Sequence, residues 1–280
     1  MRNPFRWLLI AFTGLVVCSL AVSVIGADPI KIGLHAPLTG FAAADGLSVR
    51  QSVELAVRQI NDAGGINGRP IQLVIYDDRA DAKEAVAVAA KLIEQDKVAA
   101  VVGGSYSVPM RAVAPICQQA KLPMVAGFAV HPDITKAGDF VFRVGMLGPI
   151  EGAAAGEVTG KFLKAKTACQ MTMDNDFGRA LAEGFRARAA QLGIKIVWET
   201  LYPLGEMDFT PYLARLRQLN PDVVFTSGYY NEAAQFCKQA KEMGLKSQIL
   251  GEEGFDSPKF IEIAGKAAEN VIIVTNLNRD

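Results

Sequence analysis

Residues 30–76 read IKIGLHAPLTGFAAADGLSVRQSVELAVRQINDAGGINGRPIQLVIY, and this stretch decides the fold. Two short apolar runs, 30–35 and 71–76, enclose a longer segment, 46–63, in which apolar residues recur at helical spacing. The glycines of segment 64–68 then permit the left-handed turn by which a helix ends. Strand, helix and strand in this order form the unit of a parallel sheet, whose strands are joined by crossover helices.

The same alternation continues to the end of the chain. Further helices are predicted at 82–95, 110–119, 150–163, 179–192, 210–219 and 232–243, and further strands at 98–102, 123–126, 140–144, 168–173, 195–201, 223–227, 248–250 and 271–275. Two consecutive rounds of similar size predict an α/β fold with two Rossmann-like lobes. We place the N-terminal lobe at 28–144, the C-terminal lobe at 145–276, and the start of a crossover back to the first lobe at 277–280.

The charge balance excludes one class of partner. The 280 residues include 29 Lys and Arg and 29 Asp and Glu. Nucleic-acid binding requires a surplus of basic residues, so we expect no nucleic-acid partner.

The N-terminal segment 1–27 has the features of a signal peptide. Arg2 and Arg6 precede the apolar run 7–17, and a small residue, Ala27, stands at the end. An uncleaved membrane anchor is the alternative, because the run is almost long enough to span a bilayer. Cys18 follows the bulky Val17 where a lipidation site needs a small residue. We therefore expect cleavage and a periplasmic location rather than a lipid anchor.

Motifs of enzymes and metal sites are missing. The sequence has no GxGxxG, GxxxxGK[ST], GxSxG or HExxH motif and only two histidines, of which His35 ends a predicted strand and reads as structural. Segment 174–176 lacks the glycine and glutamate of a calcium loop and fits a helix cap better. We expect no catalytic residues, no metal and no cofactor.

Three cysteines remain after the signal segment. Cys117, Cys169 and Cys237 are scattered and odd in number, so they do not form a disulfide framework. Three buried thiols are the favoured interpretation. A Cys169–Cys237 disulfide in an oxidising compartment is the alternative.

Several short motifs occur in the order and spacing of a known family. They are IKIG at 30–33, PLTG at 37–40, GGING at 64–68, YDD at 76–78 and GEEG at 251–254. With them the chain resembles the branched-chain amino-acid-binding proteins, the type I periplasmic solute-binding proteins of ABC importers, over essentially all of 28–280. The resemblance implies two lobes that close over a small ligand and present it to a membrane ABC permease.

The resemblance also implies which residues of the first lobe meet the ligand. Ser107 matches a strand-end serine that binds the ligand carboxylate, beside free N–H groups of a helix start. It also fits a helix N-cap, and the two roles are compatible. Phe128, Ala129 and Val130 match the next binding segment. Val130 stands where amino-acid binders commonly carry a threonine, and Asp45 stands where an aromatic residue often lines the pocket.

For the second lobe the resemblance implies three ligand-binding residues. Tyr229 matches a tyrosine that closes over the ligand, and Glu253 matches the acidic residue that pairs with the ligand's ammonium. Phe177 stands where a tyrosine is frequent, and with Phe128 it would make the pocket wall aromatic. A zwitterion that bridges Ser107 and Glu253 would favour the closed lobes over the open ones.

Two ligand classes remain open. Ser107 and Glu253 favour an aliphatic, branched-chain-like amino acid, whereas Val130 and Asp45 count against a typical one. The alternative is another small carboxylate or amide, such as an aromatic acid. Asp45 is either a second anchor for a cationic or hydroxylated ligand or simply solvated.

A ligand sensor and an α/β enzyme are the other function classes. A sensor requires a signalling segment and an enzyme requires a catalytic constellation, and we find neither in the sequence.

The family continues beyond the point at which this chain stops. The resemblance therefore predicts a C-terminally truncated chain, which is either a fragment or a natural short form.

Overall fold

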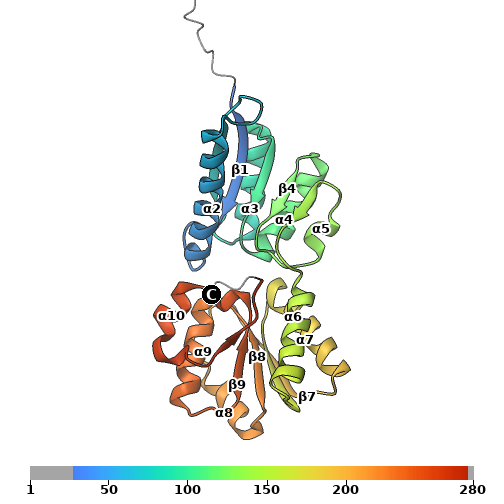
Figure 1. Cartoon of the computed structure of the whole chain (residues 1–280), viewed down its shortest axis with the longest axis vertical. Helices are drawn as coiled ribbons and strands as arrows, with labels where there is room; N and C mark the ends of the chain where they lie inside the picture. The colour runs from blue at the N-terminus through green and yellow to red at the C-terminus, as the bar shows by residue number, and fades with distance from the viewer. Residues whose placement is uncertain (1–27, 277–280) are drawn as a thin grey trace, which may run out of the picture.

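The computed structural model describes residues 28–276. The predicted signal segment 1–27, which contains Cys18, and the predicted return crossover 277–280 lie outside the described residues. Figure 1 shows two lobes stacked along the long axis, with the blue-to-green part of the chain above and the yellow-to-red part below. Each lobe contains one sheet flanked by helices, so the α/β prediction is confirmed.

The first sheet has five parallel strands in the order β2-β1-β3-β4-β5. Its strands are β1 (Ile30–Ala36), β2 (Ile71–Asp77), β3 (Ala100–Gly103), β4 (Met124–Ala126) and β5 (Val141–Arg143). The helices are α2 (Ala43–Asp62), α3 (Ala82–Lys91), which continues as a π-helical turn over Leu92–Asp96, α4 (Ser107–Gln119) and the short α5 (Asp133–Lys136).

The second sheet also has five parallel strands, in the order β10-β9-β8-β6-β7. Its strands are β6 (Thr167–Met173), β7 (Lys195–Tyr202), β8 (Val223–Ser227), β9 (Gln248–Gly251) and β10 (Ile272–Ile273). The helices are α6 (Gly148–Glu157) with a π-helical turn at Val158–Phe162, α7 (Asp176–Gln191), α8 (Thr210–Leu219), α9 (Tyr230–Glu242) and α10 (Pro258–Ala264), with 3-10 turns at Glu253–Phe255 and Gly265–Ala267.

The strand order reverses at β1 in one sheet and at β6 in the other. Each of these strands is the first of its sheet in the chain and has a neighbour on both sides. In open parallel sheets, ligands bind beyond the carboxyl ends of the strands at such switch points. The loops after these strands are therefore where a site is expected.

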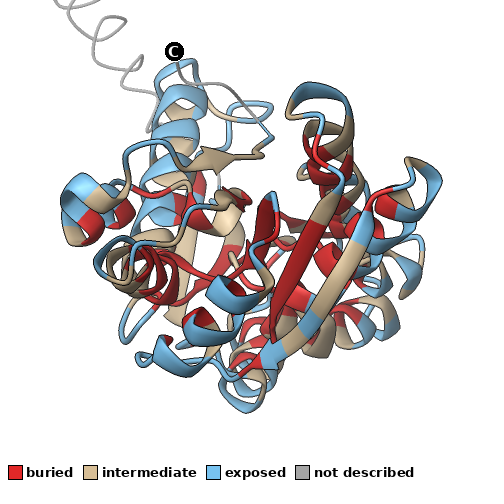
Figure 2. Ribbon diagram, turned by 90° about the horizontal axis from the view of Figure 1, so that it is seen from below, coloured by how far each residue is buried: buried red, intermediate tan, exposed pale blue. Residues whose placement is uncertain are grey.

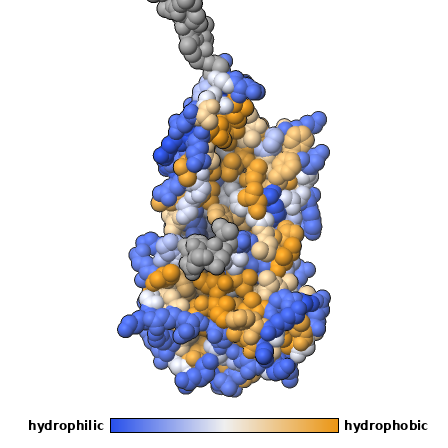
Figure 3. Space-filling view, in the orientation of Figure 1, coloured by the Kyte–Doolittle hydropathy of each residue, from blue (hydrophilic) through white to orange (hydrophobic). Residues whose placement is uncertain are grey.

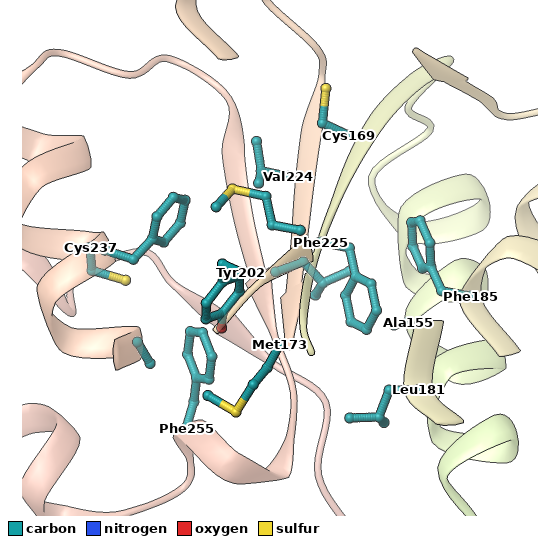
Figure 4. Close-up of a cluster of buried hydrophobic side chains, with 14 of the residues drawn as sticks. Ala155, Cys169, Met173, Leu181, Phe185, Tyr202, Val224, Phe225, Cys237 and Phe255 are labelled. Atoms are coloured by element: carbon teal, nitrogen blue, oxygen red, sulfur yellow. The ribbon is translucent and has the colours of Figure 1, made fainter. Parts of the chain in front are cut away.

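Buried apolar side chains form a core beside each sheet, and the larger one lies in the second lobe. Figure 2 shows buried strands enclosed by helices whose outer faces are exposed. In the second core the rings of Phe185 and Phe225 are stacked with centroids 4.4 Å apart (Figure 4). Cys169 and Cys237 lie in different parts of this core, and both are free and buried, as is Cys117. The prediction of three buried thiols is confirmed.

Within residues 28–276, one crossover, between β5 and α6, carries the chain from the first lobe to the second. Before it, Arg143 donates hydrogen bonds from Nη1 to the carbonyl of Ala129 (2.8 Å) and from Nη2 to that of His131 (2.7 Å). After it, the N–H of Gly148 donates to the carbonyl of Val130 (2.9 Å). Both ends of the crossover are thus bonded to the loop that follows β4.

Several boundaries differ from the sequence prediction. Helix α4 begins at Ser107 rather than at 110, since a proline in the first turn removes only an N–H that has no helical partner. Helix α7 begins at Asp176 rather than at 179, and Asn175 caps it by accepting a hydrogen bond from the N–H of Gly178 (2.8 Å). The predicted cap at 174–176 is confirmed. Helices α5 and α10 were not predicted.

The outer surface is mixed in character. Figure 3 shows apolar side chains over much of the face of the second lobe in this view, with polar residues towards its rim. Within residues 28–276, no helix is both long enough and apolar enough to cross a membrane.

Candidate functional site

A cavity of about 120 Å³ lies where loops of the two lobes meet. A single water needs only roughly 10–15 Å³, so this cavity has room for a small molecule. Every lining residue comes from α2 or from a segment that follows the carboxyl end of a strand. The lining residues are Asp45, Ser48, Ser105, Tyr106 and Phe128 from the first lobe and Phe177, Tyr229, Glu253, Gly254, Asp256, Ser257 and Pro258 from the second.

Aromatic rings form the wall of the cavity. The ring of Tyr229 lies 4.2 Å from that of Tyr106, centroid to centroid, in an edge-on arrangement. On its other side it stacks on Phe177 at 5.0 Å. Phe41 contacts both tyrosine rings, at 5.8 Å from Tyr106 and 6.2 Å from Tyr229. Because Tyr106 and Phe41 belong to the first lobe, these contacts hold the lobes together across the cavity.

Polar contacts also join the two lobes. The hydroxyl of Tyr230 donates to the carbonyl of Phe41 (2.6 Å), and the amide of Asn231 donates to the same oxygen (3.1 Å). Arg111 of α4 forms an ion pair with Asp176 of α7 (2.6 Å). The described lobes are therefore in contact on more than one side of the cavity.

Glu253 presents a partly buried carboxylate to the cavity from the loop after β9. The loop can approach β8 closely because residue 254 is glycine, where a Cβ would lie 2.3 Å from the carbonyl oxygen of Gly228. Asn276 donates a hydrogen bond to Oε2 of Glu253. Burial first, and then the neighbouring Glu151 carboxyl, raise the pKa of Glu253 well above its usual value.

Two more glutamates lie behind Glu253 and are fully buried, Glu151 and Glu252. Glu252 accepts hydrogen bonds from the N–H groups of Gly228 (2.9 Å) and Gly254 (2.7 Å). Oε1 of Glu151 accepts one from the N–H of Glu253 (2.8 Å), while its Oε2 has no hydrogen-bond partner among residues 28–276. Burial raises the pKa of Glu151 to about 7, and burial together with the neighbouring Glu151 carboxyl raises the pKa of Glu252 well above its usual value.

Asp45 presents a second carboxylate, from the first turn of α2. This turn packs closely on the loop after β1, because a Cβ at Gly46 would lie 1.9 Å from the carbonyl oxygen of Pro37. The hydroxyl of Tyr106 donates to Oδ2 of Asp45 (2.8 Å). Burial raises the pKa of Asp45, and this hydrogen bond partly opposes the shift.

Five of the residues expected from the sequence line the cavity, and three do not. The five are Asp45, Phe128, Phe177, Tyr229 and Glu253. Ser107, Ala129 and Val130 are buried and do not line it. Instead, the hydroxyl of Ser107 accepts a hydrogen bond from the N–H of Val130 (3.3 Å), which ties the start of α4 to the loop after β4.

Sequence reasoning missed Ser105 and Tyr106, which line the cavity from the same segment as Ser107. The hydroxyl oxygen of Ser105 is buried and has no hydrogen-bond partner within the described part of the chain. The sequence did indicate polar residues at this place, because the segment GGSYS at 103–107 puts two serines and a tyrosine directly after a predicted strand. The sequence did not show which of these side chains turns towards the cavity.

The cavity lining contains acidic residues but no basic ones. It includes three carboxylates, four aromatic rings and several hydroxyls, but no lysine, arginine or histidine. No group of three potential metal-ligating side chains occurs among residues 28–276. Such a lining suits an amine-bearing organic molecule, since a desolvated carboxylate is stabilised by an opposite charge.

The two-lobed fold and the cavity between the lobes match a known family over nearly the whole chain. The model of that family, described as "Periplasmic binding protein", matches residues 29–280. The chain belongs to the periplasmic binding protein family. The expected resemblance is thereby confirmed, and the protein is a solute-binding protein rather than an enzyme.

A curated relative in this family is the leucine-, isoleucine-, valine-, threonine- and alanine-binding protein of Pseudomonas aeruginosa. It is 33% identical over 274 residues, which cover 97% of this chain and 73% of the relative.

Two solved structures show what related cavities have held. A branched-chain amino acid transporter substrate-binding protein from Streptococcus pneumoniae, in complex with isoleucine, has a TM-score of 0.82 and 30% identity, covering 88% of this chain and 70% of that one. A solute-binding protein of an ABC transporter from Rhodopseudomonas palustris, in complex with 3,4-dihydroxybenzoic acid, has a TM-score of 0.79 and 26% identity, covering 87% and 67%.

Proposed function

We propose that this periplasmic binding protein captures a small amino acid with an aliphatic side chain and delivers it to an ABC importer. The observation that carries the proposal is the carboxylate of Glu253 on a cavity walled by the rings of Tyr106, Phe177 and Tyr229. The carboxylate takes the ligand's ammonium, and the rings take its apolar side chain.

The ligand's own carboxylate needs hydrogen-bond donors. Ser105 supplies a buried hydroxyl without a partner among the described residues, at the cavity and two residues before the start of α4. The first N–H groups of a helix have no helical partners and favour an anion. In this proposal Ser105 replaces Ser107 as the hydroxyl that contacts the ligand, and Ser107 holds Val130 in place.

An aromatic acid is the alternative ligand class, and one structural neighbour has such a molecule bound. The cavity lining argues for the amine instead, because it combines three carboxylates with no basic residue. An acid without an amine would meet like charges there, which is unfavourable in a partly desolvated site.

The remaining parts of the proposal concern location and partner. Segment 1–27 directs export to the periplasm, the lobes span 28–144 and 145–276, and ligand binding stabilises the closed arrangement that a membrane permease recognises. A sensor would use the same lobes but would signal to another partner.

Calorimetry on the full chain tests the function. L-leucine, L-isoleucine and L-valine are titrated beside their des-amino carboxylates, and we expect binding only of the amino acids. The Glu253→Gln variant should lose about 2–5 kcal/mol of binding free energy, as when one partner of a buried charge pair is removed. Glu242→Gln, at an exposed position, is the control. Binding of the carboxylates alone would reassign the protein to organic acids.

A further inference from the structure

Two carboxyl groups line the cavity from opposite lobes, Asp45 from the first and Glu253 from the second. Within residues 28–276, neither Asp45 nor Glu253 forms an ion pair with a basic side chain. The two are near enough for the charge of Asp45 to contribute to the raised pKa of Glu253. Like charges held together in a partly dry site destabilise each other unless a cation joins them.

Asp45 is held in a fixed position on the first-lobe side of the cavity. Its Oδ2 accepts the hydrogen bond from Tyr106, and among the described residues its Oδ1 has no hydrogen-bond partner. An acid in the first helical turn is favoured by the helix dipole, and a solvent-facing carboxylate would gain that benefit without burial. The hydrogen bond from the buried Tyr106 thus fixes the Asp45 carboxylate at the cavity, where it lines the first-lobe side.

The rings beside Asp45 also suit a cation. Tyr106 and Tyr229 line the cavity next to each other, and Phe177 stacks on Tyr229. A desolvated ammonium gains electrostatic attraction from the faces of such rings in addition to its ion pair. A purely aliphatic side chain would bury its apolar surface against the rings but would leave the Asp45 carboxylate without an opposite charge.

We propose that Asp45, positioned by Tyr106, forms a second cation subsite, and that the aliphatic side chain of the ligand ends in an amine. This inference rests on the proposed function, since Glu253 takes the α-ammonium in both. The two carboxylates stand on different lobes, so a diamino acid that reaches from one to the other joins the lobes through charge at both ends.

L-lysine and L-norleucine test this inference, because they share one carbon chain and differ by the terminal amine. Calorimetry on the full chain should show L-lysine binding at least about tenfold more tightly than L-norleucine, a difference of about 1.4 kcal/mol. In the Asp45→Asn variant, L-lysine should lose most of that advantage while the affinity for L-norleucine changes less than twofold. Asp62→Asn, the same change at an exposed position of α2 away from the cavity, should leave both affinities unchanged.

The outcomes separate this inference from the proposed function. Binding of L-norleucine at least as tight as that of L-lysine, both dependent on Glu253, would overturn the second subsite and leave the proposed function standing. A lysine preference that survives Asp45→Asn would overturn the role of Asp45. Failure of every amino acid to bind would overturn both. The wild-type comparison needs no variant, so it decides the ligand class even if Asp45→Asn fails to fold.

Discussion

Buried carboxylates are treated differently in the two lobes. In the first lobe, Asp78 is fully buried and its Oδ2 lies 2.7 Å from Nδ1 of His35, which is also fully buried. In the second lobe the buried glutamates are Glu151, Glu252 and Glu232, and among residues 28–276 their hydrogen-bond donors are backbone N–H groups alone. Burial is the main cause that raises the pKa of each of these three glutamates.

The two lobes therefore differ in how the desolvation of a buried carboxylate is compensated. The Asp78 carboxylate has a side-chain hydrogen-bond partner in His35. A buried carboxylate that has only backbone N–H groups as partners is not fully compensated for the loss of water around its charge. Its protonated form is therefore favoured, and its pKa rises. We therefore expect the first lobe to lose stability when the His35–Asp78 pair is removed. We expect the stability of the second lobe to change with pH.

The largest effect is expected from Asp78→Ala. Removing one partner of a buried pair leaves the other without compensation, and we expect a loss of about 3 kcal/mol or more in the free energy of unfolding. Oδ1 of Asp78 also accepts a hydrogen bond from the N–H of Ala80 (2.9 Å), which is lost as well. Urea denaturation measures the change. Asp62→Ala, at an exposed position, should cost less than about 0.5 kcal/mol. Equal losses in the two variants would contradict the comparison.

A smaller effect, with a distinct pH dependence, is expected from Glu151→Gln. The pKa of Glu151 is raised from 4.5 to about 7 by folding, so between these values the folded state binds more protons than the unfolded state. By linkage the free energy of unfolding then falls as pH rises through this window and levels off above it. Glutamine keeps the acceptor for the N–H of Glu253 and removes the charge.

We therefore expect Glu151→Gln to stabilise the protein at pH 8 by on the order of 1–3 kcal/mol and to have little effect near pH 4.5. Thermal unfolding at the two pH values measures the difference, with Glu242→Gln as the exposed control. A variant that is less stable than the wild type at pH 8 would show that the Glu151 carboxylate is compensated after all.

The smallest effect is expected between the lobes. Arg111 and Asp176 form the one ion pair that joins the lobes among residues 28–276, and both side chains are about a third exposed, at 36% and 30%. Exposed ion pairs contribute about 0–1 kcal/mol, so Arg111→Ala should lower the thermal midpoint by no more than about 4 °C. Arg50→Ala, which breaks the exposed pair with Glu54 inside α2, is the matched control. If Arg111→Ala destabilised the protein as much as Asp78→Ala does, the ion pair between the lobes would contribute as much stability as the buried His35–Asp78 pair, which would contradict this ranking.

The sheets could be predicted from the sequence because buried parallel strands read as short apolar runs. The run at 223–227 coincides with β8, and the predicted strand 30–35 ends one residue before β1 does. The predicted strand 271–275 shortens to Ile272–Ile273, since only two residues pair with β9. Apolar composition alone does not show how many residues find a neighbouring strand.

The cavity was less accessible to sequence reasoning. The resemblance led us to expect Glu253 and Asp45 at the cavity, but not Ser105 and Tyr106, because the backbone path after β3 decides which side chain faces inward. The burial of Glu151 and Glu252 could not be predicted from the sequence either. It arises where the start of α6 meets the loops after β8 and β9, and the sequence presents both residues as ordinary surface charges.

The bonds made by Arg143 affect how the lobes can move relative to each other. The guanidinium fixes the loop after β4 to the end of β5, and the N–H of Gly148 fixes the same loop to the start of α6. The N–H of Val144 is also bonded, to the carbonyl of Ala126 (3.1 Å). We therefore expect any bending of the crossover to occur at Gly145, Met146 and Leu147. Because the loop bonded to both ends of the crossover carries Phe128 to the cavity, we expect a ligand that displaces Phe128 to shift this loop as well.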